Sequence, residues 1–154
     1  MTARETTDGG LAATLELLRR PQRRRGLVAV VSDFVESAPK DGPPDWERAL
    51  RALAARHQLL GVEVIDPREL ELPATGLVTF VDAETGRQVE VQTADRGVRN
   101  RYAAAAAQQR QGIADALRHC GAGHLQLRTD GKWVEDIVRY VITSRRAAAN
   151  GGVR

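Results

Sequence analysis

An aspartate that directly follows an apolar run is the first candidate for chemistry in this sequence. Leu27–Val31 is an unbroken run of aliphatic residues, and Ser32 and Asp33 come next. Such a run predicts a strand of a parallel sheet that is buried on both faces. Ligands of open parallel sheets bind just beyond the carboxyl ends of the strands. Asp33 therefore lies where a ligand-binding carboxylate is expected, or it caps the following turn, where Asp is also favoured.

A second predicted strand also ends at acidic residues. Leu59–Ile65 is followed by Asp66, and Glu69 comes shortly after Pro67, which cannot continue a central strand. Asp33 and Asp66 are thus the residues that a metal- or phosphate-dependent enzyme would use. No glycine-rich phosphate loop follows either strand, and no histidine or second acid adjoins Asp33 in the sequence. We therefore expect no catalytic residues and no enzymatic activity.

The remaining histidine and cysteine residues form no recognisable metal or catalytic motif. Cys120 is the single cysteine, which excludes an intrachain disulfide, and His57, His119 and His124 are scattered. His119 and Cys120 are adjacent, so on a helix they point in different directions and do not form a dyad. We expect a cytoplasmic chain, because a single cysteine suits a reducing compartment and the sequence shows no signal peptide. We also expect no membrane contact, because no apolar segment is long enough to cross a bilayer.

Arg19–Arg25 is the one dense basic cluster in a chain whose net charge is only +3. Such a cluster could bind the phosphates of nucleic acid. It also fits a solvated helix end, where cations complement the negative end of the helix dipole. We favour the helix end, because no aromatic side chains that would stack on bases accompany the cluster. Binding of nucleic acid is therefore a minor alternative.

Helix and strand patterns alternate along the chain and must position these residues. Four helices are predicted from apolar faces: one with Leu11–Leu18 that Pro21 ends, one with Trp46–His57, a long one with Tyr102–Leu117 that stops near Gly121, and a last one with Trp133–Val141. The predicted parallel strands are Leu27–Val31, Leu59–Ile65 and His124–Arg128, and the predicted hairpin arms are Leu77–Val81 and Gln88–Gln92. This order predicts an α/β fold with a mainly parallel sheet and an added β-hairpin. One hairpin face is polar, so we expect the hairpin at a sheet edge.

Several side chains on the predicted helices are assigned to packing. Asp45 is the expected N-cap of the helix that carries Trp46, and His57 lies on the apolar edge of that helix near its end. Trp46, Trp133 and Tyr102 are expected to be core anchors rather than platforms on which a ligand stacks.

Two separated motifs carry a resemblance to a known family. The first is Val-Val-Ser-Asp-Phe at Val30–Phe34, and the second is Val-Glu-Val-Ile-Asp-Pro-Arg-Glu at Val62–Glu69. Together with the helix between them, they resemble the C-terminal half of the bacterial family known as domain of unknown function 58. The resemblance covers about Thr7–Arg146. The combination is fairly specific, whereas either motif alone is weak.

The resemblance implies a fold and a function. It implies a partial von Willebrand factor A-like, Rossmann-like three-layer fold, of which residues 1–146 form the C-terminal part and residues 147–154 a disordered tail. Members of the family are typically encoded beside a MoxR-type AAA+ ATPase. We therefore expect a protein-interaction module that works with such an ATPase in a chaperone-like assembly.

The resemblance also implies a magnesium site, which this chain holds only in part. Ser32 and Asp33 match the last of three sequence elements that build it, and Phe34 replaces a frequent glycine. Thr7 matches the threonine element, with Thr6 nearly as good. The first element, Asp-x-Ser-x-Ser, does not occur. Asp33 and Thr7 thus form an incomplete site, so we expect no cofactor here and Mg²⁺ only in a full-length parent.

The absence of the first element has a structural consequence. We expect the chain to be a fragment of a longer protein, which could carry a membrane anchor, rather than a naturally short relative. A missing first strand would leave one edge of Leu27–Val31 open for pairing. We therefore expect self-association through this edge or a swap of elements between protomers.

Asp66 and Glu69 belong to the family pattern. We expect them to organise the loop after their strand, where Arg68 pairs with one of them.

Overall fold

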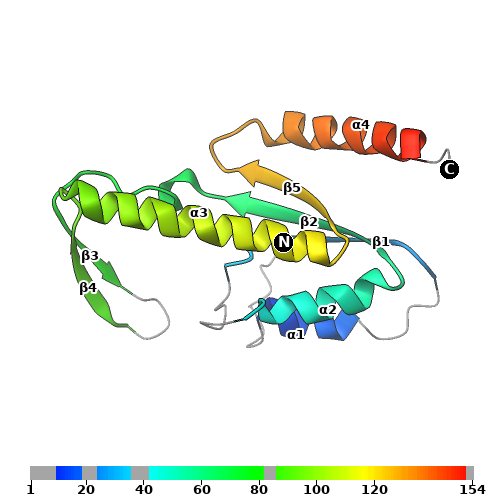
Figure 1. Cartoon of the computed structure of the whole chain (residues 1–154), viewed down its shortest axis with the longest axis horizontal. Helices are drawn as coiled ribbons and strands as arrows, with labels where there is room; N and C mark the ends of the chain where they lie inside the picture. The colour runs from blue at the N-terminus through cyan, green and yellow to red at the C-terminus, as the bar shows by residue number, and fades with distance from the viewer. Residues whose placement is uncertain (1–9, 19–23, 36–41, 82–85, 152–154) are drawn as a thin grey trace, which may run out of the picture. The chain divides into compact units, whose positions relative to one another are not determined.

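The computed structural model describes residues 10–18, 24–35, 42–81 and 86–151. Helices and strands alternate as the sequence predicted (Figure 1). Their order is α1 (Leu11–Leu18), β1 (Leu27–Ser32), α2 (Asp45–Ala54), β2 (Gln58–Ile65), the 3₁₀ helix η1 (Pro67–Glu69), β3 (Leu77–Val81), β4 (Gln88–Gln92), α3 (Arg96–His119), β5 (Gly123–Arg128) and α4 (Trp133–Gly151). The chain forms two compact units, a sheet unit of Met1–Ile65 with Gly112–Arg154 and a hairpin unit of Asp66–Gln111.

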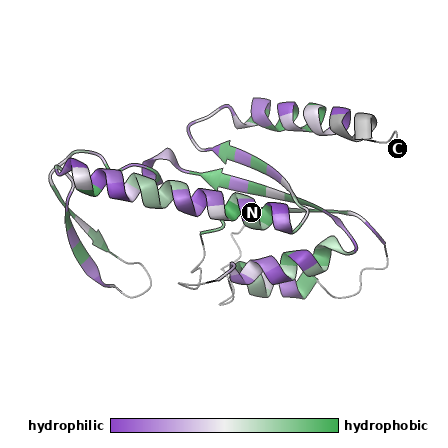
Figure 2. Ribbon diagram, viewed as in Figure 1, coloured by the Kyte–Doolittle hydropathy of each residue, from purple (hydrophilic) through white to green (hydrophobic). Residues whose placement is uncertain are grey.

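The sheet unit is built on a parallel sheet of three strands in the order β1-β2-β5. Within this unit, α1 and α2 lie on one side of the sheet and α4 lies on the other (Figure 1). The strands form the middle layer; green predominates on β1 and β2, whereas green and purple alternate on β5 (Figure 2). Parallel strands need such cover on both faces, because they carry few polar side chains. The predicted α/β fold with a mainly parallel sheet is thereby confirmed.

The core of the sheet unit lies between the sheet and the helices α1, α2 and the end of α3. Gly61 on β2 makes the close approach of α3 possible, because a side chain there would meet Leu117 Cδ2 at 2.8 Å. The largest apolar members of this core are fully or almost fully buried. They are Leu15, Phe34, Trp46, Leu50, Leu53, Leu59, Ile113 and Leu117.

Strand β1 differs from its prediction in one respect. Val30 is buried, but its neighbour Val31 is 67% exposed and Leu27 is 62% exposed. The expectation of burial on both faces was therefore wrong. The physical reason is the position of β1 at the edge of the sheet, while α4 packs on β5 at the opposite edge.

The hairpin unit has its own two-stranded antiparallel sheet, β3 with β4. The prediction of a hairpin is confirmed, but the expectation that it extends the edge of the parallel sheet is wrong. Thr93, which is fully buried, fixes the ends of the hairpin: its Oγ1 donates a hydrogen bond to the carbonyl of Gly76 at 2.8 Å. Arg99 on α3 donates to the carbonyl of Thr93 at 2.6 Å. These bonds join the hairpin to the start of α3.

The helices agree with some of the smaller expectations and differ from others. Helix α2 begins at Asp45 itself, so its N-cap is Pro44 and not Asp45, and the helix ends before His57. Trp46 is a core residue as predicted. Trp133 is 56% exposed, so its assignment to the core was wrong. Helix α4 extends to Gly151 and includes part of the predicted tail, residues 147–154.

Candidate functional site

Ser32 and Asp33 lie at the carboxyl end of β1 in a loop that they organise themselves. Asp33 is exposed, and its Oδ1 accepts hydrogen bonds from the backbone N–H of Val35 at 3.1 Å and from Ser32 Oγ at 3.4 Å. Ser32 Oγ in turn accepts from the backbone N–H of Phe34 at 3.1 Å. The two interpretations of Asp33 are therefore compatible. Asp33 lies at the end of the strand where ligands bind, and its carboxylate also caps the following turn.

Phe34 adopts a backbone conformation that is unusual for a residue with a side chain. Its φ is +57°, in the left-handed region that favours glycine. The ring is buried and packs edge-on against Trp46, with the ring centroids 5.2 Å apart. Burial of this large ring offsets the cost of the left-handed backbone, which is about 1–2 kcal/mol. The loop after β1 therefore turns at Phe34 with the left-handed backbone conformation that glycine usually provides.

The other residues of the predicted site lie elsewhere. Thr7, and Thr6 with it, falls outside the residues that the structure describes. Asp66 and Glu69 belong to the hairpin unit. Asp66 caps η1 by accepting a hydrogen bond from the backbone N–H of Arg68 at 3.0 Å, and the carbonyl of Glu69 accepts one from Tyr102 Oη at 2.9 Å. Both residues organise their loop through these hydrogen bonds.

The described part of the chain does not fit a magnesium ion. Within residues 10–18, 24–35, 42–81 and 86–151, no group of three His, Cys, Asp or Glu side chains could hold a metal. Asp33 and Ser32 offer one carboxylate and one hydroxyl, and both already bond to their own loop. Magnesium needs a near-octahedral set of oxygen ligands, so these two groups alone do not provide a site.

Glu63 is a buried acidic residue that the sequence analysis missed. It lies on the central strand β2 and is fully buried. Its Oε2 accepts a hydrogen bond from Gln126 Nε2 at 2.9 Å and lies 2.7 Å from His124 Nε2. Both partners lie on β5, and Gln126 is the register partner of Glu63. A carboxyl group buried inside a protein needs such partners, and here they tie β5 to β2.

The signal for Glu63 was present in the sequence. Glu63 stands between Val62 and Val64 in a run that was predicted to be a buried strand. A charged residue type at such a position requires a partner, but the sequence does not say which residue provides it.

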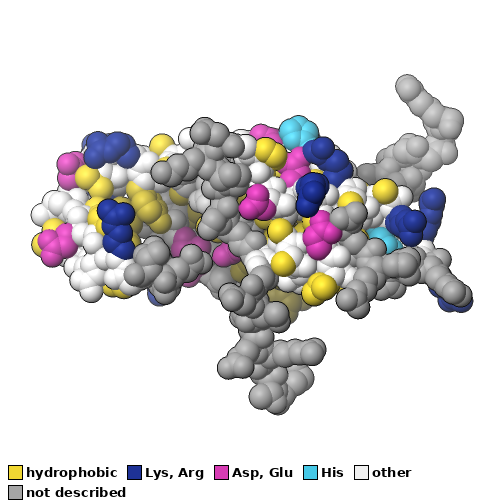
Figure 3. All heavy atoms as spheres, turned by 90° about the horizontal axis from the view of Figure 1, so that it is seen from below, with side chains coloured by type: hydrophobic (Ala, Val, Ile, Leu, Met, Phe, Trp, Pro, Cys, Tyr) yellow, Lys and Arg dark blue, Asp and Glu magenta, His cyan; other side chains and the backbone are white. Residues whose placement is uncertain are grey.

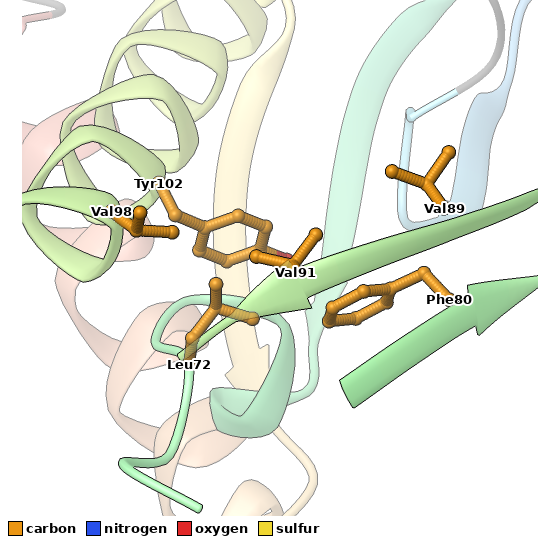
Figure 4. A pocket seen from close by; sticks show the side chains of 6 residues that line it. All are labelled: Leu72, Phe80, Val89, Val91, Val98 and Tyr102. Atoms are coloured by element: carbon orange, nitrogen blue, oxygen red, sulfur yellow. The ribbon is translucent and has the colours of Figure 1, made fainter. Parts of the chain in front are cut away.

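The hairpin unit contains a partly open apolar cavity of about 260 Å³ (Figure 4). Phe80 on β3 is 41% exposed, and Val89, its register partner on β4, is 47% exposed. Tyr102 turns its ring toward the cavity, while its hydroxyl group is bonded to Glu69. All of the lining side chains come from this unit: Leu72, Phe80, Val89, Val91, Val98 and Tyr102.

Two further findings bear on the general predictions. None of the described helices combines the length and the apolar composition that crossing a bilayer requires. Of the basic cluster Arg19–Arg25, the structure describes Arg24 and Arg25, which are both exposed.

The chain is similar to several mycobacterial proteins. It is 48% identical over 143 residues, or 93% of its length, to uncharacterized proteins of Mycobacterium avium, Mycobacterium bovis and Mycobacterium tuberculosis. The match covers 80% of the protein from M. avium but 43% of each of the other two. The chain thus spans less than half the length of these two relatives.

A solved structure and a family model also match. The crystal structure of the conserved hypothetical protein BatB from Bacteroides thetaiotaomicron matches with a TM-score of 0.43 and 18% identity, over 94% of this chain and 62% of that one. The model of the family "Protein of unknown function DUF58" matches residues 2–112, which is more than half of the chain. The chain therefore belongs to the DUF58 family.

Proposed function

We propose that this chain is a protein-interaction module that binds a MoxR-type AAA+ ATPase through the apolar cavity of the hairpin unit. The main support for this proposal is the cavity itself. It is partly open and lined by apolar side chains, so an apolar side chain of a protein partner can insert into it. Its volume of about 260 Å³ matches one or two side chains rather than a cofactor, whose sites range from about 300 to 1,000 Å³.

The surface around the cavity supports a protein partner. Phe80, Val89 and Tyr102 are each more than a third exposed. Exposed apolar side chains that gather in one place are typical of interaction sites. Hydrophobic side chains also reach the surface at the hairpin end of the view in Figure 3, next to basic and acidic ones. An apolar centre with a charged rim is the usual anatomy of a protein interface.

The choice of partner rests on family membership. The family is typically encoded beside a MoxR-type ATPase, as the resemblance of the Ser-Asp-Phe and Asp-Pro-Arg-Glu motifs implies, and the model of that family matches this chain. An ATPase that remodels other proteins needs adaptor surfaces that recognise it. In this proposal the chain provides one such surface, and Asp33 is a remnant of the metal site rather than a working ligand.

The test is a calorimetric titration of the full chain with a MoxR-type AAA+ ATPase from the same organism. Phe80→Ser should weaken binding by about tenfold or more, because it removes an aromatic wall of the cavity. Val81→Ser is the matched control. Val81 is the next residue on β3, is 59% exposed and points to the opposite face of the hairpin.

Three outcomes are distinguishable. Binding that Phe80→Ser weakens and Val81→Ser leaves unchanged supports the proposal. Binding that both variants leave unchanged places the contact elsewhere and overturns the role of the cavity. Failure of the unmodified chain to bind at any tested concentration overturns the proposed function itself.

A further inference from the structure

The cavity of the hairpin unit has an inner end and a mouth, which differ in exposure. At the inner end Leu72 is buried, and Val91 and Val98 are half-buried. Phe80 and Val89 are 41% and 47% exposed and form the mouth. In Figure 4 the three inner residues lie toward α3, and the two residues of the mouth lie farther along the hairpin. A group that enters the cavity therefore meets the less exposed residues with its far end.

The described side chains that line the cavity offer no free polar group at its inner end. Tyr102 is the one lining residue whose side chain carries a polar atom. Its hydroxyl group donates a hydrogen bond to the carbonyl of Glu69 at 2.9 Å, and its ring faces the cavity (Figure 4). A polar atom that reached the inner end would lose its hydrogen bonds to water and would gain none in return.

The cavity has room for one aromatic ring or one branched aliphatic side chain. Its volume is about 260 Å³, whereas an engineered apolar cavity of about 150 Å³ already binds benzene. A side chain on the backbone of a protein partner enters with its tip first, while the backbone stays at the mouth. The chemistry of the tip therefore decides whether the side chain is accepted.

We propose that the cavity selects the inserted side chain by its tip, accepting phenylalanine or leucine and rejecting tyrosine. Phenylalanine and tyrosine share the same ring, but tyrosine carries a hydroxyl group at its far end. That group would lie unpaired among Leu72, Val91 and Val98, which weakens binding by about tenfold or more. The inference rests on the proposed function for the identity of the partner, and it adds which kind of residue of the ATPase inserts.

The first test is an NMR titration of the full chain with N-acetyl-phenylalaninamide, N-acetyl-leucinamide and N-acetyl-tyrosinamide. Shifts of the methyl signals of Leu72, Val91 and Val98 report entry into the cavity, and the methyl signals of Leu50 in the core of the sheet unit are the reference. The first two probes should bind, and the dissociation constant of the tyrosine probe should exceed that of the phenylalanine probe by about tenfold or more. Equal dissociation constants, or no shift with any probe up to its solubility limit, would overturn the inference.

The second test introduces a hydroxyl group into the cavity. Val91→Thr keeps the shape of the side chain and offers the tyrosine probe a hydrogen-bond partner at the inner end. The preference for phenylalanine should therefore fall to about threefold or less. Val89→Thr is the matched control, because Val89 lies two residues away on the same face of β4 but at the exposed mouth, where water already solvates a hydroxyl group. It should keep the full preference.

Thermal unfolding of both variants shows that each is folded during the titration. A preference that Val91→Thr leaves unchanged, or that both variants reduce equally, would overturn the assignment of the inner end.

Competition separates this inference from the proposed function. In the calorimetric titration with the ATPase, N-acetyl-phenylalaninamide should weaken binding at a concentration at which N-acetyl-tyrosinamide does not. If the ATPase fails to bind while the probes show the expected preference, the proposed function is overturned and the selectivity of the cavity is supported. If the ATPase binds but the probes do not discriminate, the selectivity is overturned and the proposed function is not.

Discussion

The ring of Phe34 packs edge-on against the indole of Trp46, at a centroid separation of 5.2 Å and an interplanar angle of 62°. Phe34 has a left-handed backbone, and Trp46 is the second residue of α2. This contact therefore ties the loop that carries Asp33 to the helix that covers the sheet. The pair holds the carboxyl end of β1 in place by apolar packing, whereas Asp33 itself is hydrogen-bonded to Ser32 and Val35.

The first prediction concerns the backbone of Phe34. Phe34→Ala should lower the free energy of unfolding by about 3–5 kcal/mol, because the ring leaves a cavity. Phe34→Gly should be less harmful than Phe34→Ala by about 1 kcal/mol, since glycine adopts positive φ without strain. Urea denaturation of the three proteins measures both differences. If Gly proves more destabilising than Ala, as at an ordinary position, the left-handed conformation of Phe34 is wrong.

The second prediction concerns the buried carboxyl group of Glu63. His124→Ala should lower the free energy of unfolding by about 1–3 kcal/mol, because Glu63 loses a partner inside the protein. Replacing Glu63 as well, in Glu63→Leu/His124→Ala, removes the buried polar group and should recover much of that loss. A double-mutant cycle measured by urea denaturation tests the coupling. Strictly additive effects of the two substitutions would contradict the contact.

The third prediction concerns the approach of α3 to β2. Gly61→Ala should destabilise the fold by about 1–3 kcal/mol, because the added methyl group meets Leu117 and the core must shift. Gly112→Ala is the control: it also lies in the sheet unit, has open space around it and sits within α3. It should be neutral or stabilise the fold by up to about 1 kcal/mol through helix propensity. Equal thermal shifts for the two variants would refute the close approach.

The fourth prediction concerns the thiol of Cys120. Burial, followed by the charge of Glu47, raises the pKa of Cys120 above its ordinary value. The folded state therefore keeps the proton at a pH where the unfolded chain has lost it. The resulting contribution to stability is complete below the ordinary thiol pKa of about 8.5 and is lost as the pH rises through the higher pKa of the folded state.

Comparison with Cys120→Ala isolates this effect from the other groups that titrate at alkaline pH. The difference in unfolding free energy between the unmodified chain and the variant should shrink as the pH is raised from 8 toward 10. A thiol reagent should also label the folded chain far more slowly than the urea-unfolded chain at pH 8. A stability difference that is constant over this range would contradict the raised pKa.

Local sequence patterns determined the elements of this protein. Three patterns depend on neighbouring residues only: the aliphatic run Leu27–Val31, the alternation in the arms of the hairpin and the spacing of leucines before Pro21. The strands and helices lie where these patterns predicted. The Ser-Asp-Phe and Asp-Pro-Arg-Glu motifs likewise led to the family to which the chain belongs. The positions of the elements and the family motifs both depend on short segments of the chain, so the sequence alone was sufficient to predict them.

Only the tertiary structure decided which side chains these elements bury. It leaves Val31 and Trp133 exposed, gives the hairpin a sheet of its own, and joins Glu63 to His124, which is 61 positions away. Burial depends on which elements pack against each other, and residues that are distant in the chain make those contacts. A strand pattern states that a segment is apolar, but the neighbours that cover it, or leave an edge such as that of β1 open, are set by the assembled fold.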